Sequence, residues 1–359
     1  MIGPKLNFAK SIIASNFKRL TFPLKCSLAV TYRCNMSCKM CSIWKKPSDR
    51  QELTVGEVEN FFRKAGRFSW VGLTGGEPFF RGDIEDVVRV IIKQSAYLYA
   101  LHFGTNGSFT DRIIKLAENI RKKHKRLKLV FTVSIDGPPG LHNEIRGVHG
   151  IWDKAVETFV RLKQMPDVKA QIGFTISPYN MGRFREAFDA IRRAYPKLRF
   201  DDININVFQK SDFFYDNQGM QGIDETELFS QIKDIMAMDK EGFSINNFLR
   251  RVYLKFYLEY RKQGKTPLKC QALSSSLFID PYGDLFPCVV FNKKLINIKE
   301  MGHDLSLVWR RDATRRISRE CVYNNCPVCW SPCDAFSSIG GSLLKSVRKY
   351  VQDNMPKYS

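Results

Sequence analysis

The pattern of apolar and polar residues changes period repeatedly between residues 24 and 208. Short apolar runs with the length of buried strands occur at 27–32, 70–74, 100–105, 129–135, 170–177 and 202–208. Between them, apolar residues recur at helical spacing in 55–66, 84–94, 111–124, 151–164 and 184–194. Strands that alternate with helices in this way pair in parallel. Six strands are too few for an eight-stranded barrel, so we expect an α/β fold with a partial (β/α)6 TIM-like barrel over residues 25–210.

The segments on either side of this barrel have other patterns. Residues 1–24 are basic and amphipathic, and their apolar side chains fall on one helical face: Leu6, Phe8, Ile12, Ile13, Phe17 and Leu20. We expect this helix to close the bottom of the barrel, and the alternative is a helix on a membrane surface. The other expected segments are a helical connector at 211–265, a small cysteine-rich unit with a β-hairpin and a helix at 266–340, and a basic amphipathic tail at 341–359.

The charge balance is strongly basic. The chain has 57 lysine and arginine residues against 36 aspartate and glutamate residues, a formal net charge of +21. This favours an anionic partner, which could be nucleic acid, an anionic membrane surface or a phosphorylated substrate. There is no apolar core of a secretory signal and no apolar run of 18 residues. We therefore expect a cytoplasmic protein, with a peripheral position at the inner membrane face as a further expectation, and ten cysteines that bind metal rather than form disulfides.

A group of cysteines near the start is the most informative chemical feature. Cys34, Cys38 and Cys41 are spaced C-x3-C-x2-C, so one short loop can offer three thiolates to one cluster. A [4Fe–4S] cluster takes four ligands, and three protein ligands leave one iron free to hold a small molecule. A zinc knuckle or a disulfide pair fits less well, because zinc needs further ligands close by and the next cysteine is Cys270.

Three further motifs each follow a predicted strand. They are Gly75, Gly76, Glu77 and Pro78, then Thr105 and Asn106, and then Ser134 and Asp136 with His142 and Arg146 shortly after. In barrels of this kind the site forms at the carboxyl ends of the strands, so these residues are expected to meet there. The cysteine loop and the three motifs, in this order, resemble the signature of radical S-adenosylmethionine (SAM) enzymes.

The resemblance implies a role for each motif. Cys34, Cys38 and Cys41 would hold a [4Fe–4S] cluster whose free iron chelates SAM, and one electron would cleave SAM to a 5′-deoxyadenosyl radical that abstracts hydrogen from a substrate. The implied SAM-binding residues are Gly75, Gly76, Glu77, Pro78, Thr105, Asn106, Ser134, Asp136 and Arg146.

Some of these residues suit one role in SAM binding, and others have an alternative structural role. Arg146 suits a bidentate pair with the SAM carboxylate, whereas strand-end capping is an alternative for Ser134 and Asp136. His142 is expected to orient a loop, and no catalytic residue is assigned. The sixth strand and the loop after it are expected to line the substrate site through Asn204, Asn206, Gln209, Phe213, Phe214 and Tyr215.

Six cysteines late in the chain indicate a second metal site. The unit that contains them is similar to the SPASM and twitch extensions, which carry auxiliary [4Fe–4S] clusters in radical SAM enzymes. The spacings Cys270-x17-Cys288 and Cys326-x2-Cys329 resemble the twitch form, which holds one cluster. Besides Cys270 and Cys288, the expected ligands are Cys326 and Cys329, then Cys333, with Cys321 last. A structural zinc ribbon is the alternative.

These features predict a radical SAM oxidoreductase. A fully ligated auxiliary cluster would pass electrons in a net oxidation or bond formation on a peptide, sugar or lipid precursor. An external one-electron reductant such as a flavodoxin or ferredoxin is expected. The first 24 residues are too few for a separate leader-peptide-binding domain. The alternatives are an RNA-modifying radical SAM enzyme, suggested by the basic run 121–128, and a non-catalytic iron–sulfur or zinc protein on the same fold. Nucleic acid is the less favoured partner.

Overall fold

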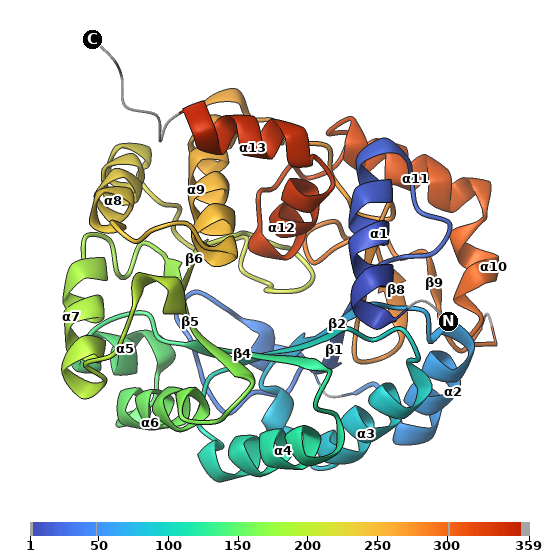
Figure 1. The fold of residues 1–359 in the computed structure, drawn as a ribbon, viewed down its shortest axis with the longest axis horizontal. Helices are drawn as coiled ribbons and strands as arrows, with labels where there is room; N and C mark the ends of the chain where they lie inside the picture. The colour runs from blue at the N-terminus through green and yellow to red at the C-terminus, as the bar shows by residue number, and fades with distance from the viewer. Residues whose placement is uncertain (1–2, 48, 301, 353–359) are drawn as a thin grey trace.

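The computed structural model describes residues 3–47, 49–300 and 302–352. Within these ranges one nine-stranded sheet has the order β6-β5-β4-β3-β2-β1-β7-β8-β9 (Figure 1). The barrel strands are β1 (Lys25–Thr31), β2 (Trp70–Gly75), β3 (Ala100–Thr105), β4 (Lys128–Ser134), β5 (Val168–Ile176) and β6 (Ile203–Val207). Every neighbouring pair among these six is parallel. The predicted α/β partial barrel is confirmed.

Helices cover the outer face of the barrel strands. They are α2 (Val55–Ala65), α3 (Ile84–Gln94), α4 (Thr110–Lys123), α6 (Ile151–Lys163) and α7 (Phe184–Ala194). The short helix α5 (Pro139–Arg146) follows β4 and packs against α6. Single 3-10 turns are η1 (Ile43–Lys45), η2 (Pro78–Phe80) and η3 (Phe200–Asp202). Helix α2 begins at a capping box, in which the Thr54 hydroxyl accepts from the Glu57 N–H at 3.2 Å. The sequence did not predict α5, because its eight residues are too few for a helical period to stand out.

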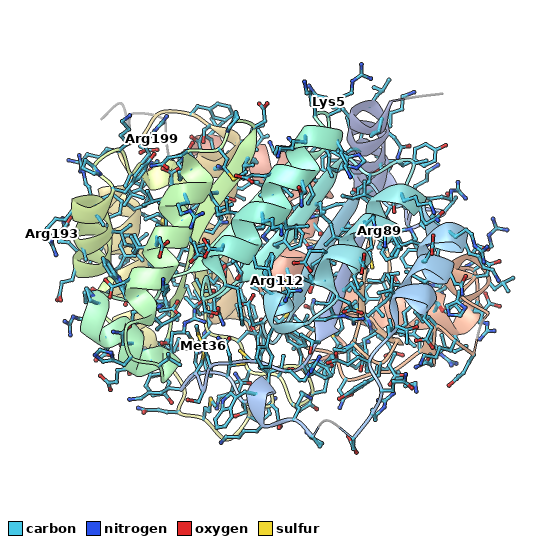
Figure 2. The ribbon with its side chains drawn as sticks, turned by 90° about the horizontal axis from the view of Figure 1, so that it is seen from below. Lys5, Met36, Arg89, Arg112, Arg193 and Arg199 are labelled. Atoms are coloured by element: carbon cyan, nitrogen blue, oxygen red, sulfur yellow. The ribbon has the colours of Figure 1, made fainter. Side chains whose placement is uncertain are left out.

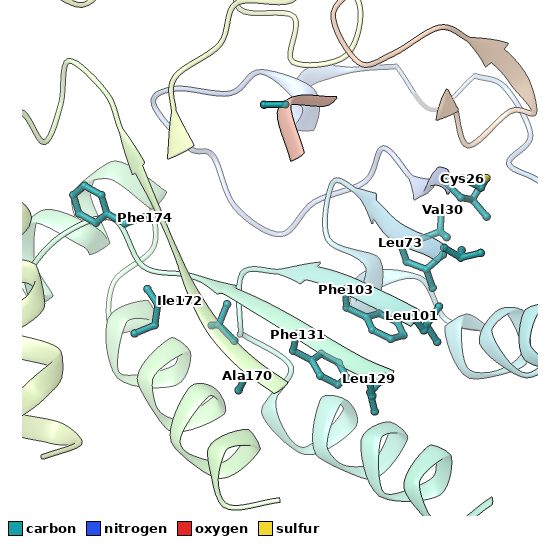
Figure 3. Packing of buried hydrophobic residues seen from close by; sticks show 14 of the residues in the cluster. Cys26, Val30, Leu73, Leu101, Phe103, Leu129, Phe131, Ala170, Ile172 and Phe174 are labelled. Carbon is teal, nitrogen blue, oxygen red and sulfur yellow. The ribbon is translucent and has the colours of Figure 1, made fainter. Parts of the chain in front are cut away.

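Side chains along the barrel strands point alternately outward, into the core beneath the helices, and inward, toward a cavity. Large apolar side chains point outward to the helices, as Figure 3 shows for Leu101, Phe103, Leu129 and Phe131. Phe103 and Phe131 stand opposite each other in register, and their ring centroids stack at 4.9 Å. The alternating positions point inward, where they line a cavity. Most of them are small or polar: Ser27, Gly72, His102, Gly104, Thr132, Gly173, Asn204 and Asn206.

The amino-terminal helix α1 (Pro4–Phe17) closes one end of the barrel. The ring of Phe8 lies 5.0 Å from that of Tyr99, and the Asn7 side-chain amide donates to the Ser69 hydroxyl at 2.9 Å. Tyr99 and Ser69 immediately precede β3 and β2, so α1 lies at the amino ends of these strands. One face of the helix therefore has the barrel-closing position favoured from the sequence.

The carboxyl-terminal part extends the same sheet. After α8 (Glu225–Met238) and α9 (Ile245–Gln263), the expected hairpin forms from β7 (Ser276–Ile279) and β8 (Asp284–Phe286), followed by β9 (Ile296–Asn297), α10 (Leu305–Trp309), α11 (Asp312–Val322), α12 (Pro332–Gly340) and α13 (Leu343–Gln352). Strand β7 pairs in parallel with β1, so the cysteine-rich unit is hydrogen-bonded to the first barrel strand. The sequence pattern did not predict this pairing.

Candidate active site

The cysteine loop follows the carboxyl end of β1. Cys34, Cys38 and Cys41 all face the barrel cavity, whose volume is about 360 Å³, and none of them is in a disulfide. The N–H of Cys41 donates to the carbonyl of Cys38 at 3.2 Å, which folds the loop back on itself. The loop thus brings the three thiols to one side of one cavity, as a three-thiolate cluster site requires.

Two segments hold this loop in place. The Lys39 N–H donates to the carbonyl of Ile145 in α5 at 2.8 Å, and the Lys39 ammonium pairs with Glu144 at 2.6 Å. From the other side, the side-chain amide of Asn217 donates to the carbonyl of Met40 at 3.1 Å. The loop conformation therefore depends on contacts with both the barrel and the segment after β6.

The turn after β2 approaches the cysteine loop very closely. Gly75 has a φ of 130°, and a Cβ there would lie 2.1 Å from the carbonyl oxygen of Thr31. A Cβ at Gly76 would lie 2.2 Å from the carbonyl oxygen of Arg33. Only glycine fits at these two positions, and both glycines line the cavity.

Glu77 lies behind that turn. It is 1% exposed and accepts hydrogen bonds from the Asn106 N–H at 2.7 Å and the Thr105 hydroxyl at 2.9 Å. Burial raises the pKa of Glu77 to about 7. Thr105 and Asn106 line the cavity, whereas Glu77 and Pro78 do not. Glu77 therefore ties two cavity-lining turns together.

Arg146 brings a cation to the cavity beside the cysteines. Its guanidinium pairs with buried Asp136, and one nitrogen lies 3.8 Å from the Cys38 sulfur. Burial alone would lower the pKa of Arg146, but the charges of Asp136 and Cys38 outweigh it and raise the pKa. The Arg146 Nε has no hydrogen-bond partner in the described structure, so its N–H can still donate to a carboxylate. Ser134 lines the cavity, and Asp136 lies behind it.

His142 supports the same region. Its Nδ1 accepts from the Asp136 N–H at 3.0 Å, and burial lowers the pKa of His142 to about 2. The ring is therefore neutral at ordinary pH, and it does not line the cavity. This geometry suits the loop-orienting role expected from the sequence.

The late cysteines fall into two groups. Cys270, Cys288, Cys321, Cys326 and Cys329 line a second, small cavity together with Asp334. Burial raises the pKa of Cys329 to about 12 and that of Asp334 to about 6. A hydrogen bond between Cys321 and Cys326 raises the pKa of Cys321 and lowers that of Cys326. The sequence had ranked Cys321 last, yet the structure places its thiol with this group.

Cys333 does not share that cavity. It is exposed and lines the barrel cavity, and its carbonyl accepts from the Lys25 ammonium at 2.5 Å. The sequence predicts Cys333 ahead of Cys321 as a cluster ligand; in the structure Cys321 lines the small cavity and Cys333 lines the barrel cavity. Cys333 is the second residue of α12, and Ser331 and Pro332 before it line the barrel cavity as well.

The arrangement of the five grouped thiols bears on the kind of metal site. Among the described residues, no three cysteine, histidine, aspartate or glutamate side chains come close enough to bind one metal ion. The thiols instead surround a cavity, and thiolates are the ligands of iron–sulfur clusters. Four thiolates from such a set would satisfy one [4Fe–4S] cluster.

The inner wall of the barrel cavity contains residues that the sequence motifs did not predict. Lys25, Trp70 and His102 line it alongside the expected Asn204, Asn206, Gln209, Phe214 and Tyr215, whereas Phe213 packs away from it. Among the described residues that line it, none is aspartate or glutamate. The signal that could have found the missed residues is the alternation along each strand, because they share the inward positions.

Comparison with known proteins decides the family. The family model of the radical SAM superfamily matches residues 28–206, and that of the SPASM iron–sulfur cluster-binding domain matches residues 270–334. This chain belongs to the radical SAM superfamily. It is a radical SAM enzyme with a SPASM domain. The two domains imply SAM and a [4Fe–4S] cluster in the barrel, and auxiliary iron–sulfur cluster binding in the SPASM domain.

Three relatives illustrate the similarity. The antilisterial bacteriocin subtilosin biosynthesis protein AlbA of Bacillus subtilis (strain 168) is 22% identical, over 96% of this chain and 73% of AlbA. The structure of Streptococcus suis SuiB bound to SAM matches with a TM-score of 0.57 and 18% identity, over 82% of this chain and 67% of SuiB. The structure of anSMEcpe with bound SAM matches with a TM-score of 0.60 and 15% identity, over 93% of this chain and all of anSMEcpe.

The share of each relative that this chain covers differs from one relative to the next. The chain spans less than half the length of seven further curated relatives that it matches. At these identities the two solved structures support the fold alone. None of the helices in the described part of the chain has the length and apolar character needed to cross a membrane.

Proposed function

We propose that this radical SAM enzyme abstracts hydrogen from a peptide held in the barrel cavity. One observation carries the proposal: the three loop thiols, Arg146 and the polar inner wall of the strands all line one cavity of about 360 Å³. Cluster, SAM and substrate would therefore share a single enclosed space, in which a reactive group is kept from water.

Three of the relatives support a peptide as the substrate class. AlbA is a bacteriocin biosynthesis protein, SuiB has been solved with its precursor peptide SuiA, and anSMEcpe has been solved with the Cp18Cys peptide. The cavity wall agrees with this class. Asn204 and Asn206 offer side-chain amides, which can both donate to and accept from peptide groups.

The proposed mechanism divides between the cofactors and the chain. When bound, the cluster and SAM supply a 5′-deoxyadenosyl radical that takes a hydrogen atom from the substrate. Cys34, Cys38 and Cys41 would hold the cluster as thiolates. Burial raises the pKa of Cys34 to about 11 and that of Cys41 to about 12, so these protons leave as metal binds.

The remaining SAM-binding residues act by position and charge. Arg146 stays cationic and would pair with the SAM carboxylate. Gly75 and Gly76 would let the cofactor approach their backbone, because no side chain intervenes. Glu77 would hold this turn against Asn106 through its two acceptor oxygens. Asp136 would orient Arg146.

The second thiol group would serve electron transfer. We assign Cys270, Cys288, Cys326 and Cys329 as ligands of one auxiliary [4Fe–4S] cluster, with Cys321 beside them. A cluster whose four corners are held by the protein has no open site for substrate. Its role would be to accept the electron left after hydrogen abstraction, which favours a net oxidation or bond formation. An external reductant such as a flavodoxin or ferredoxin would supply the first electron.

The division of the chain follows from these assignments. The barrel at 25–210 would carry SAM chemistry, 211–265 would connect, and 266–340 would carry the auxiliary cluster, between basic ends at 1–24 and 341–359. The radical SAM match at 28–206 and the SPASM match at 270–334 fall inside the two proposed cluster-bearing segments.

The test is SAM cleavage by the anaerobically reconstituted protein with dithionite, with Cys34→Ala as the matched variant. We expect 5′-deoxyadenosine and about eight irons per chain, the content of two cubane clusters. The variant should lose about four irons and the product. A fully loaded protein that neither binds nor cleaves SAM would overturn the proposal.

The substrate class is tested separately, by adding peptides, sugar nucleotides or lipids to the same assay. Peptides should stimulate cleavage and become lighter by the hydrogens removed. Stimulation confined to sugars or lipids would overturn the peptide assignment and leave the SAM chemistry standing.

A further inference from the structure

The exposed apolar side chains of this molecule are concentrated in one region. Of the twelve large hydrophobic side chains that are exposed among the described residues, eight belong to α1, to α13 and to the segment at the start of α9. They are Leu6, Ile13, Phe17, Phe243, Ile245, Leu344, Val347 and Val351. Scattered single exposures are normal, but a grouping of this kind marks an interaction site.

The two helices are joined directly. The Asn16 side-chain amide donates to the carbonyl of Gly340 at 2.9 Å, and its oxygen accepts from the Leu343 N–H at 2.6 Å. Figure 1 shows the end of α1 beside the start of α13. The two most exposed apolar side chains, Leu344 at 85% and Phe17 at 79%, therefore flank one joint. At the other end of α13, the ring of Phe243 lies 6.0 Å from that of Tyr350.

Helix α1 has two apolar faces with different neighbours. Its inner face packs on the barrel through Phe8, as described above. Its outer face carries Leu6, Ile13 and Phe17, whose spacing places them along one side of a helix. The two interpretations of the amino-terminal segment are thus compatible, since one face closes the barrel and the other is left uncovered by the rest of the described chain.

The charges on the two helices of this surface are all positive. Neither α1 nor α13 contains an acidic residue, and the first in the sequence is Asp49. Lys5, Lys10 and Lys18 are exposed on and beside α1, and Lys345 and Arg348 are exposed on α13. Lys349 forms an ion pair with Glu259 of α9 and is therefore already partnered.

We propose that α1 and α13 together form a docking surface for an anionic lipid bilayer. A helix that presents Leu and Phe with lysines on its flanks lies in the plane of a membrane interface, where anionic headgroups attract the lysines and the apolar side chains enter the acyl boundary. Nucleic acid would match the charge but not the exposed apolar stripe. A second copy of the chain would bring the same positive charges together, which is repulsive.

Docking in this way leaves the cluster loop accessible. Lys5 lies at one edge of the molecule and Met36, inside the cysteine loop, lies toward the opposite edge (Figure 2). A soluble reductant could therefore reach the loop while α1 contacts lipid.

The test is vesicle flotation of the reconstituted holoenzyme. The protein should float to the top of the density gradient with vesicles of phosphatidylcholine and phosphatidylglycerol, and it should stay at the bottom with vesicles of phosphatidylcholine alone. Added salt should weaken its binding to the anionic vesicles. Ile13→Ser with Phe17→Ser should reduce the bound fraction by roughly tenfold. Lys10→Gln with Lys18→Gln should do so by a similar factor at low salt. Leu307→Ser, at a side chain 59% exposed on α10, is the matched control and should bind as the wild type does.

Iron content and SAM cleavage should be unchanged in all these variants, which separates loss of docking from loss of folding. Equal flotation of the Ile13/Phe17 variant and the wild type would overturn the proposal. So would a wild type that does not float and that light scattering shows to be a dimer which the same substitutions dissociate, since the surface would then bind a second copy.

Discussion

Cys329 and Cys333 are only four residues apart but line different cavities. Cys329 faces the cavity shared with four other thiols, and Cys333 faces the barrel. The change occurs at the start of α12, whose first residue is Pro332, and there the backbone carbonyl of Cys333 accepts from the Lys25 ammonium. Side-chain direction, which spacing alone does not encode, thus separates a proposed cluster ligand from a residue of the substrate cavity.

This separation predicts different iron contents for two substitutions. Cys329→Ala should lower iron from about eight to about four per chain, because one cluster loses a corner. Cys333→Ala should keep about eight. Iron and sulfide analysis with electron paramagnetic resonance of the reduced proteins measures both. Loss of the auxiliary signal in Cys333→Ala would show that the thiol turns to the cluster when iron is present.

Gly76 is a position at which the structure leaves no room for a side chain. A methyl group there would meet the backbone of Arg33, so we expect Gly76→Ala to destabilise folding by about 2 kcal/mol or more. It should also displace the loop, with loss of SAM binding. Gly82→Ala is the matched control, because a Cβ at Gly82 meets nothing within 4 Å. Thermal unfolding and SAM-binding titration compare the two, and equal behaviour would refute the close approach.

At the scale of elements, the turn between β7 and β8 contains a buried carboxyl group. Asp280 is 3% exposed and accepts from the N–H groups of Tyr282 at 2.9 Å and Asp284 at 2.8 Å. Burial, with the nearby charge of Asp284, raises the pKa of Asp280 to about 6. In the unfolded chain this group ionises near 3.8. Between these values the folded state keeps a proton that the unfolded chain has released, so stability falls as pH rises through the window.

Asp280→Asn should therefore stabilise the protein in a pH-dependent way. Asparagine keeps an oxygen that can accept both N–H bonds without ionising, so the gain should be about 2 to 3 kcal/mol above pH 7 and a fraction of that near pH 4.5. Urea unfolding across this range measures it. Asp312→Asn, at a side chain 98% exposed, should change stability little at either pH. A gain that is constant with pH would mean that the carboxyl group is not the cause.

The elements that the sequence predicted well are those with a clear period. All six barrel strands and α2, α3, α4, α6 and α7 lie within two residues of their expected bounds, because each buries one regular apolar face. The sequence pattern did not predict α5, which carries Arg146 and His142, because this helix is short and begins with a proline directly after another proline. Motifs predicted which side chains meet at the cavity, but not that Glu77 and Asp136 stand behind it, since both are set by hydrogen bonds between distant segments.

At the scale of the whole molecule, the cysteine-rich unit is part of the barrel sheet. Residues 25–28 of β1 pair with residues 276–279 of β7. The strand that leads into the loop of Cys34 thus has a barrel strand on one side and the hairpin on the other. The two proposed cluster-bearing units therefore share one sheet.

A fragment ending at residue 265 should therefore fold poorly. Without β7, strand β1 becomes an open, largely apolar edge, and such edges pair with other chains. We expect the fragment to aggregate in size-exclusion chromatography and to bind little iron. The full chain should unfold in one cooperative transition. A monomeric fragment with about four irons would contradict this expectation.

The pairing of β1 with β7 also bears on how an electron would travel. One strand leads to the thiols of the first cluster, and its neighbour begins shortly after Cys270 of the second. No hinge separates the two strands, because four consecutive residue pairs lock them in register. The sheet would therefore fix the length of the path between the two proposed clusters. In the proposed function, substrate binding would change the driving force for electron transfer along that path, and the length of the path would stay the same.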